Sequence, residues 1–418
     1  MSIGYACLTV GVPQTALKSC ISKNASNEKL LDLISYNLNS LENTIDYNIE
    51  NDIRLFRISS DLIPFGSSPV NNLPWWDVFA SQLLLIGKKI RTSGMRVSMH
   101  PGQYTVLNSP HKEVVKRAIE DLNYHTLVLD SLGVGVEHKI VLHIGGIYDD
   151  KRMAIQRFVT TYHGLYDAVK QRVVLENDDK SYNIYDALEI ATILKAPIIF
   201  DNLHNKMNSC DEQKSEFYWI NECKKTWQKK DGHQKMHYSQ QDLKKKAGSH
   251  SSSIRITEFM SFYEELDRKD IDIMLEVKDK NLSALKCINC TTADKNIKAL
   301  ELEWSRYKYK ILENSPSDYV EIRKLLQNKN NYPDISFYNL IEGALRKESI
   351  AENSINAALH IWGYFKGTAS DKERISFLKS IENYRQGKTS NNAIKNSLLK
   401  MAVKYQKSYL LGSYYFVI

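Results

Sequence analysis

Ionisable side chains recur where short apolar segments of this sequence end. Six such segments carry one at or near the end: His100, His143, Glu176, Asp201, His237 and Glu276. Taken singly, a residue of this kind is more often a hydrogen-bonded polar group or a helix cap than a functional group. Six of them on one edge of a fold would repel one another or go unpaired unless a cation lay between them. The pattern therefore predicts a metal site.

The mixture of ligand types indicates which ions such a site would take. Imidazole and carboxylate together suit zinc, manganese or iron(II), whereas all-oxygen sites suit magnesium or calcium. Glu176 lies on the central segment of the series and can bridge two ions. We predict that His100 and His143 hold one ion with it, and that the other ion is held by Asp201, His237 and Glu276. Two cations about 3.5–4 Å apart that share a carboxylate are the general apparatus for in-line phosphoester displacement.

Three further residues accompany this set. His204 lies just beyond Asp201, and His250 stands in a Gly-Ser-His-Ser stretch, so the two suggest a third ion site. Lys235 lies two residues before His237 and would face the same side of a strand. A lysine directed at metal ions is unusual, and a phosphate-binding or solvated Lys235 is the alternative.

The elements that must position these side chains alternate along the chain. Runs such as RLFRIS, RVVLEN and PIIFDN are typical of strands buried on both faces of a parallel sheet. We predict eight strands, at residues 3–9, 53–59, 95–100, 139–144, 172–177, 197–202, 234–239 and 270–277. Helix-compatible segments lie between them, at residues 75–93, 110–132, 154–171 and 183–194. This order favours an α/β fold, a (β/α)8 TIM barrel with its active site at the C-terminal rim, over a doubly wound open sheet.

The character of the chain changes near Cys290. No strong strand run follows, and helical periodicity appears at residues 302–312, 317–328, 355–366 and 371–385. We predict a barrel domain at residues 1–290 and a smaller all-helical domain at residues 297–418. Cys287 and Cys290 form a lone CxxC that cannot complete a tetrahedral zinc site, so we expect free thiols, with redox or metal chemistry as the alternative.

Composition narrows the class of protein. Among 418 residues, 43% are hydrophobic and 25% charged, which excludes a disordered or collagen-like chain. Six cysteines are too sparse for a disulfide framework. The sequence has no stretch of about 18 apolar residues and no signal-type N-terminus, so we expect a cytoplasmic protein without a membrane partner. The net charge of +7 permits a nucleic-acid partner but does not demand one.

Two features are compatible with nucleic-acid binding. Residues 224–246 contain eight lysines, which flank His237 and precede His250, although a lysine run is usually a solvated face. Gln103 and Tyr104 follow His100 and pair an amide with a ring that can wedge into a base stack; a packed tyrosine is the alternative. The remaining histidines have no aligned partners, and we expect them to be surface or structural residues: His111, His125, His138, His163, His233 and His360.

At these residues the sequence resembles the UV damage endonuclease family, metal-dependent barrels related to endonuclease IV. The resemblance covers roughly residues 1–285, with Gly102 and Tyr104 as departures from bacterial relatives that can have Asn and Phe there. The matching strings are Phe56-Arg57-Ile58-Ser59-Ser60, His100-Pro101-Gly102-Gln103, Leu142-His143-Ile144-Gly145-Gly146, Leu175-Glu176-Asn177-Asp178-Asp179-Lys180, Phe200-Asp201, His204, Lys235-Met236-His237-Tyr238-Ser239, His250 and Glu276.

The resemblance implies a DNA repair enzyme that nicks double-stranded DNA immediately 5′ to a UV photoproduct without a nucleotide cofactor. It implies two or three divalent ions, Mn²⁺ most often and Zn²⁺ or another ion otherwise, and a chain that acts as a monomer. The residues implied as paired-metal ligands are His100, His143, Glu176, Asp201, His237 and Glu276, with His204 and His250 for the third metal. Glu176, Lys235, His237 and Glu276 would be catalytic, and Lys235 can be carboxylated in the family. Tyr5, Gln103 and Tyr104 would contact the lesion.

The C-terminal part resembles a helical domain of unknown function that can also stand beside thiouracil-desulfurase-like domains. The matching strings are Glu303-Trp304-Ser305-Arg306-Tyr307-Lys308-Tyr309-Lys310, Trp362-Gly363-Tyr364-Phe365-Lys366 and Tyr384-Arg385-Gln386-Gly387-Lys388. Such a domain could add DNA contacts or serve as a stability or partner module.

Two other enzyme classes use similar ligands, and a non-enzymatic protein is a third alternative. A sugar isomerase or epimerase of the same barrel class also gathers His, Glu and Asp, but a small neutral sugar needs neither the Lys235–His204–His250 group nor the lysine run. An apurinic-site endonuclease of the endonuclease IV type is closer in chemistry, and Gln103-Tyr104 favours the UV family over it. A non-enzymatic binding module would have little use for a full ligand set.

Overall fold

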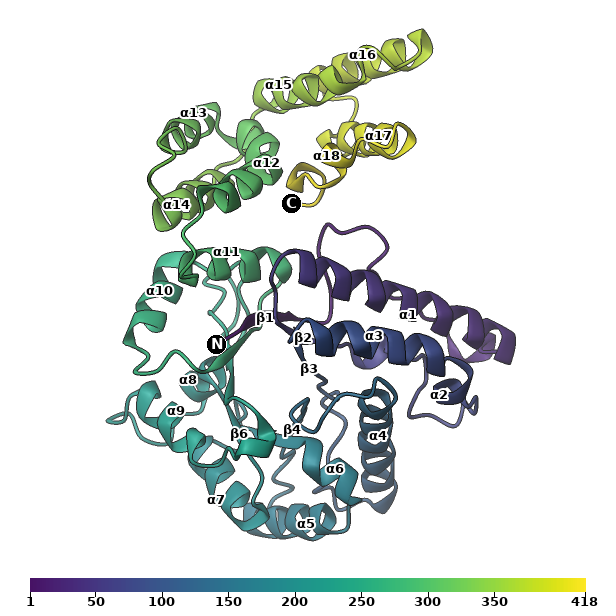
Figure 1. Ribbon diagram of the computed structural model, residues 1–418, viewed down its shortest axis with the longest axis vertical. Helices are drawn as coiled ribbons and strands as arrows, with labels where there is room; N and C mark the ends of the chain where they lie inside the picture. Colours follow the sequence, from purple (N-terminus) through teal and green to yellow (C-terminus); the bar gives the residue numbers. More distant parts are fainter. The chain divides into compact units, whose positions relative to one another are not determined.

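Eight parallel strands form the centre of the N-terminal part of the chain (Figure 1). The computed structural model describes residues 1–418. Neighbouring strands pair in the order β3-β2-β1-β8-β7-β6-β5-β4, and a parallel bridge between Met99 and Ile140 joins the two outer strands, which closes the barrel. The predicted barrel and the positions of all eight strands are confirmed. Their bounds are β1 Ile3–Ala6, β2 Leu55–Arg57, β3 Arg96–Ser98, β4 Ile140–His143, β5 Val173–Glu176, β6 Ile198–Asp201, β7 Lys235–Tyr238 and β8 Asp272–Leu275.

Helices connect successive strands, as right-handed parallel crossovers require. Two predicted helices are each divided in the structure: residues 75–93 form α2 and α3, and residues 154–171 lie in α5 and α6. The helices of this part are α1 Asn27–Glu50, α2 Trp75–Val78, α3 Ala80–Thr92, α4 Lys112–Ser131, α5 Lys151–His163, α6 Asp167–Arg172, α7 Ile184–Leu194, α8 Asn202–Met207, α9 Glu216–Lys224, α10 Ile256–Glu265 and α11 Asn281–Thr291. Short 3-10 turns are η1 Ser22–Asn24, η2 Ser60–Leu62 and η3 Lys229–Asp231.

Buried charge pairs fill the N-terminal end of the barrel. Arg96 pairs with Asp272 at 3.1 Å, and Lys139 pairs with Asp231 at 2.6 Å. Arg96 also donates to the carbonyl of Asp231, so the pairs form one network. In a TIM barrel this end contributes to stability, whereas active sites are built at the opposite end.

The second part of the chain is helical, as predicted. Its helices are α12 Ile297–Asn314, α13 Pro316–Leu325, α14 Asp334–Leu345, α15 Ala351–Trp362, α16 Asp371–Arg385, α17 Asn391–Lys404 and α18 Ser408–Leu411, with turns η4 Gly363–Phe365 and η5 Tyr414–Phe416. Trp362 and Phe377 stack in its core with ring centroids 4.4 Å apart. Cys287 and Cys290 lie buried on α11 outside any disulfide, and burial raises the pKa of Cys290.

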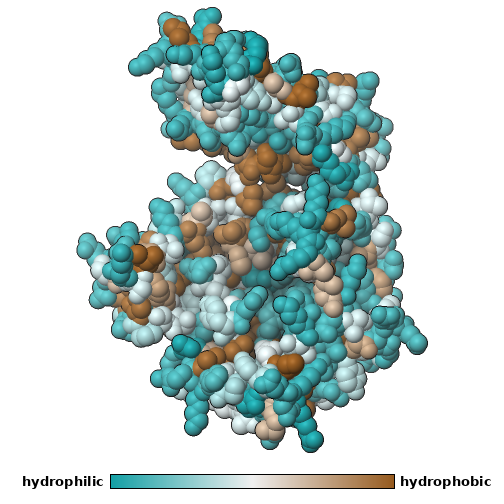
Figure 2. Space-filling model, turned by 180° about the vertical axis from the view of Figure 1, so that it is seen from behind, coloured by the Kyte–Doolittle hydropathy of each residue, from teal (hydrophilic) through white to brown (hydrophobic).

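The chain divides into two compact units. The first comprises residues 1–9, 13–254 and 261–285, and the second comprises residues 10–12, 255–260 and 286–418. No helix is both long and apolar enough to cross a membrane. On the face drawn in Figure 2, hydrophilic side chains predominate and hydrophobic ones gather in small patches.

A chain ending at Asn296 should keep the barrel and its ion-binding capacity, because all eight strands and every candidate ligand precede residue 277. Truncation removes Glu342, the partner of Lys286 at 2.8 Å, and we expect a lower melting temperature as a result. Calorimetry and metal analysis of the truncated chain check this prediction. A product that is insoluble or binds no ion would contradict it.

Candidate metal centre

The candidate ligands meet at the C-terminal end of the barrel because each stands at the end of a strand. His143, Glu176 and Asp201 are the last residues of β4, β5 and β6. His237 lies inside β7, opposite Asp201 in the ladder, and Glu276 directly follows β8. His100 follows β3 by two residues. In a parallel barrel these ends share one rim, which is where such folds place their active sites.

Glu176 is the centre of the group, and its side chain is 1% exposed. One of its oxygens, Oε2, lies 3.1 Å from His100 Nε2 and 3.5 Å from His143 Nε2. The other, Oε1, lies 2.5 Å from His237 Nδ1. Each oxygen therefore faces a different set of histidines, which is the arrangement expected of a carboxylate shared between two ions.

Three sets of three ligands share Glu176. In each set the ligand atoms lie within 4.8 Å of one another, and the sets are His100–His143–Glu176, Glu176–His237–Glu276 and Glu176–Asp201–His204. The structure thus brings together the first predicted set. Asp201 groups with His204 rather than with His237 and Glu276, because Asp201 caps α8 and accepts the backbone N–H of His204. His250 lies outside these sets, with Nε2 at 3.8 Å from Glu276 Oε2.

Backbone carbonyls orient two of the histidines. His100 Nδ1 lies 3.1 Å from the Pro101 carbonyl, and His204 Nδ1 lies 2.9 Å from the Asn177 carbonyl. A carbonyl only accepts, so Nδ1 carries the proton in both rings. Nε2 is then the nitrogen without a proton in both rings, as in a metal-binding histidine that gives its other N–H to such an acceptor. In His100 it faces Glu176, whereas in His204 it is Nδ1 that lies 3.8 Å from Asp201 Oδ1 and 4.0 Å from Glu176 Oε1.

Burial and mutual charge shift the pKa values of this group in different directions. Burial alone would raise the pKa of Glu176, but His237 and His143 outweigh it and hold the value well below the usual range. Burial lowers the pKa of His237 to about 4 and raises that of Asp201 to about 7. Burial also opposes the charged form of His204, yet Asp201 and Glu176 raise its pKa to about 9.

The donor set fits divalent metal ions. Asp201 Oδ2 and His143 Nδ1 are buried without a hydrogen-bond partner, although buried polar atoms are nearly always paired. Imidazole nitrogens and carboxylate oxygens in comparable number suit manganese, zinc or iron(II). An ion held there with Glu176 and His204 would account for the unpaired Asp201 oxygen.

Lys235 is fully buried on the same face of β7 as His237. Its Nζ has no hydrogen-bond partner, and burial together with Arg96 lowers its pKa well below the usual value. It does not belong to any of the three ligand sets. The alternative of a solvated Lys235 is therefore wrong.

Arg57 is a member of the centre that the sequence pattern did not predict. It is the last residue of β2, and its Nη2 lies 2.6 Å from Glu276 Oε1 and 2.9 Å from His237 Nε2. Its partners lie 219 and 180 residues away along the chain, so no local motif joins them. An arginine at the end of the strand next to β3, which His100 follows, was the available signal.

The predicted lesion contacts differ in accessibility. Gln103 and Tyr104 are exposed on the loop after β3, and Tyr104 is 72% exposed with its ring over Gly102, where an added Cβ would lie 2.4 Å from the ring. Tyr5 is fully buried, and its hydroxyl donates to Asn48 Oδ1 of α1 at 2.8 Å. The structure does not place Tyr5 where it could touch a lesion, because its ring points toward the helix layer.

The lysine run is split between the two ends of the barrel. Lys224 to Lys230 precede β7 and so lie toward the N-terminal end, where Lys224 pairs with Asp270. Lys244, Lys245 and Lys246 follow β7 and are exposed on the loop that carries His250. Only these three match the prediction of positive charge beside the rim. His125 and His138 are buried and hydrogen-bonded, as expected of structural histidines.

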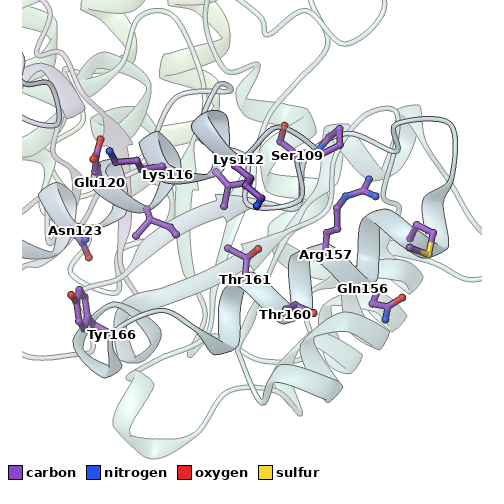
Figure 3. A pocket seen from close by; sticks show the side chains of 14 residues that line it. Ser109, Lys112, Lys116, Glu120, Asn123, Gln156, Arg157, Thr160, Thr161 and Tyr166 are labelled. Carbon is purple, nitrogen blue, oxygen red and sulfur yellow. The ribbon is translucent and has the colours of Figure 1, made fainter.

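A groove of about 760 Å³ lies apart from this centre (Figure 3). Lys112, Lys116 and Glu120 line it from α4, and Arg157 and Thr161 line it from α5. None of the candidate ligands faces it.

Ion binding at this centre should strengthen as pH rises. The raised pKa of His204, about 9, means that an ion must displace a proton from Nε2 at neutral pH. Below that pKa, we expect the Mn²⁺ affinity to rise by up to about tenfold per pH unit, and calorimetry in buffers of different ionisation enthalpy should detect proton release. A His204→Asn variant should lose most of this slope, and pH-independent binding in the wild type would contradict the assignment.

Comparison with known proteins agrees with this geometry. The family model for UV-endonuclease UvdE matches residues 1–305, and that for a protein of unknown function, DUF1722, matches residues 308–418. A UV DNA damage endonuclease of Clostridium perfringens is 40% identical over 389 residues, which cover 91% of this chain and 92% of that protein. A UV DNA damage endonuclease of Bacillus cereus is 32% identical, over 68% of this chain and 90% of that protein. The crystal structure of SacUVDE superposes with a TM-score of 0.66 at 36% identity, over 69% of this chain and 97% of that one. The chain belongs to the UV-endonuclease UvdE family.

Proposed function

We propose that this protein is a divalent-metal-dependent DNA endonuclease that hydrolyses the phosphodiester 5′ to UV photoproducts, cyclobutane dimers and 6-4 photoproducts, in double-stranded DNA. The observation that carries the proposal is the buried Glu176, whose two oxygens face separate histidine sets within 3.5 Å. Family membership supports the DNA substrate. Manganese is the proposed ion, and the ligand set would hold zinc as well.

The chain's own residues prepare the centre for phosphodiester chemistry. Bound divalent ions would polarise the phosphoryl oxygens and lower the pKa of a bound water. Glu176 holds the ligand sets together, and Asp201 and Glu276 supply the remaining negative charge. The centre draws all its ligands from one chain, and this supports a monomer. The absence of a nucleotide cofactor is proposed from the family resemblance alone.

We also propose that Lys235 is carboxylated, which requires its amine to be neutral. The resemblance to the family implies that this lysine can be carboxylated. The Nζ is fully buried without a hydrogen-bond partner, and burial together with Arg96 lowers its pKa, which favours the neutral amine, the form that reacts with carbon dioxide. Carboxylation would replace this unpaired amine by an anion, with the cations Arg96 and Arg57 among the groups that act on it.

Lesion recognition is proposed for Gln103 and Tyr104. Both are exposed on the loop beside His100, and neither is a candidate ligand. Holding a lesion outside the stack costs a few kcal/mol, least at a distorted site. A stacked ring can return about 1–3 kcal/mol of that cost.

The activity is tested with Mn²⁺ and an end-labelled duplex that carries one cyclobutane dimer or one 6-4 photoproduct. We expect a single nick on the 5′ side of the lesion, with a 3′-hydroxyl and a 5′-phosphate, and no nick in the presence of a chelator. Duplexes with an abasic site or no lesion serve as comparisons. Cleavage only at the abasic site would favour an apurinic-site endonuclease instead.

Glu176→Gln should abolish cleavage and leave the fold intact, because an amide cannot bridge two cations as a carboxylate does. Loss of a partner that merely orients a ligand costs about 10–100-fold, so loss of this ligand should cost more than about 100-fold. Glu303→Gln, a buried glutamate of the helical part, is the control and should cleave normally. Turnover of the Glu176→Gln variant at the wild-type rate would refute the shared-ligand assignment.

Replacing both Gln103 and Tyr104 by alanine should separate lesion recognition from phosphodiester chemistry. We expect unchanged ion content and a roughly tenfold or greater loss of discrimination between damaged and intact duplex, since about 1.4 kcal/mol corresponds to a factor of ten. Competitive binding at one fixed salt concentration measures the ratio. Tyr166→Ala is the matched control, because Tyr166 is also 72% exposed but lines the groove of Figure 3. An unchanged ratio would show that the lesion is read elsewhere.

A further inference from the structure

The histidines of the centre differ in the hydrogen-bond partner of one ring nitrogen. Behind His100 and His204 a backbone carbonyl accepts Nδ1–H, so that Nε2 is free for an ion. Behind His237 stands Arg57, which can only donate. His237 Nε2 must therefore accept from Arg57 Nη2 at 2.9 Å, and the ring proton is left on Nδ1.

The proton on His237 Nδ1 points at the place where an ion would bind. Nδ1 lies 2.5 Å from Glu176 Oε1 and 3.4 Å from Glu276 Oε1, the other two members of its ligand set. For Nδ1 to bind an ion, the ring proton would have to move to Nε2, where it would face the N–H of Arg57. The contact between Arg57 and His237 is therefore incompatible with His237 acting as a neutral ligand through Nδ1.

The positive charge of Arg57 also opposes ion binding in the Glu176–His237–Glu276 set. The Arg57 guanidinium is buried, and its Nη2 lies 2.6 Å from Glu276 Oε1, so it already neutralises part of the charge that would attract an ion. A divalent ion in this set would sit a few ångströms from that cation, where repulsion is strong because water is excluded. In the set His100–His143–Glu176, by contrast, Nε2 of both histidines faces the Glu176 carboxylate.

From these contacts we infer that Arg57 is a built-in competitor for the ion of the Glu176–His237–Glu276 set. The inference rests on the proposed metal-dependent function and adds an order of loading. The His100–His143–Glu176 set fills first and tightly. The Glu176–His237–Glu276 set fills second and weakly, because its ion must end the contact of Arg57 with His237. Arg57 is a positioning residue here, since it acts through His237 and Glu276.

The test is a titration of the DNA-free, full-length protein with Mn²⁺ alone. Calorimetry measures the binding steps, and metal analysis measures the number of bound ions. Apart from any binding at the Glu176–Asp201–His204 set, the wild type should show a tight step and a weak step. Arg57→Met should strengthen the weak step by about tenfold or more and leave the tight step unchanged. Arg57→Lys keeps the charge and should resemble the wild type.

Arg96→Met is the matched control. Arg96 is buried to a similar degree, pairs with Asp272 in the same barrel, and lies in the network at the opposite end. The Arg96→Met variant should have a lower free energy of unfolding than the wild type, with both ion-binding steps unchanged. Nitrogen NMR of ¹⁵N-histidine provides a second readout, because the His237 proton should sit on Nδ1 in the ion-free wild type and lose that preference in Arg57→Met. If the methionine variant does not fold, Arg57→Gln replaces it with the same expectation.

The outcomes separate the two proposals. A wild type that binds no ion would refute the metal-dependent function. A wild type that binds two ions while Arg57→Met binds the second no more tightly, or more weakly, would overturn the role of Arg57 alone. That role is also overturned if Arg57→Lys strengthens the weak step as far as Arg57→Met does.

Discussion

Three carboxylates are buried at one mouth of this barrel, and their mutual repulsion is the constraint on which the centre depends. Glu176 and Asp201 are almost completely shielded from water, and Glu276 is nearly so. Anions so placed are tolerable only when cations or hydrogen-bond donors compensate them. The surrounding residues supply this compensation: histidines face Glu176, Arg57 faces Glu276, and the first turn of α8 donates to Asp201. Asp201 Oδ2 remains unpaired, and an ion bound beside it would supply the missing compensation.

The rest of the barrel holds these groups at fixed separations. Asn177 follows Glu176 and exchanges two hydrogen bonds with the backbone of Asp201, which ties the ends of β5 and β6 together. The charge network around Arg96 and Asp272 closes the other end of the barrel, so stability and chemistry are built at opposite ends. Because these side chains are buried at the ends of paired strands, they have little room to move apart.

How far the sequence predicts this structure depends on how local each signal is. The strands and their terminal ligands are predictable because buried parallel strands are apolar runs and their ends share one rim. The pairing of His204 with Asp201 follows from α8, whose N-terminus Asp201 caps. Strand periodicity does not contain this detail, nor the contact of His204 Nδ1 with the Asn177 carbonyl. The contacts of Arg57 and the burial of Tyr5 depend on residues far apart in the chain. Helix α17 was not predicted, although its apolar residues Ile394, Leu398 and Met401 stand at helical spacing and were a usable signal.

The closure of the barrel has a mechanical consequence. Between β3 and β4 a bridge at Met99 and Ile140 joins the sheet, with two backbone hydrogen bonds at Met99, whereas the other seams pair two to four residues each. His100 and His143 stand on the two sides of that weakest seam. An ion held by both would link β3 to β4 across this seam and reinforce the closure of the barrel. Removal of the ion would thus loosen the barrel along a defined line, and the strands beside this seam would be the first to exchange their amide hydrogens.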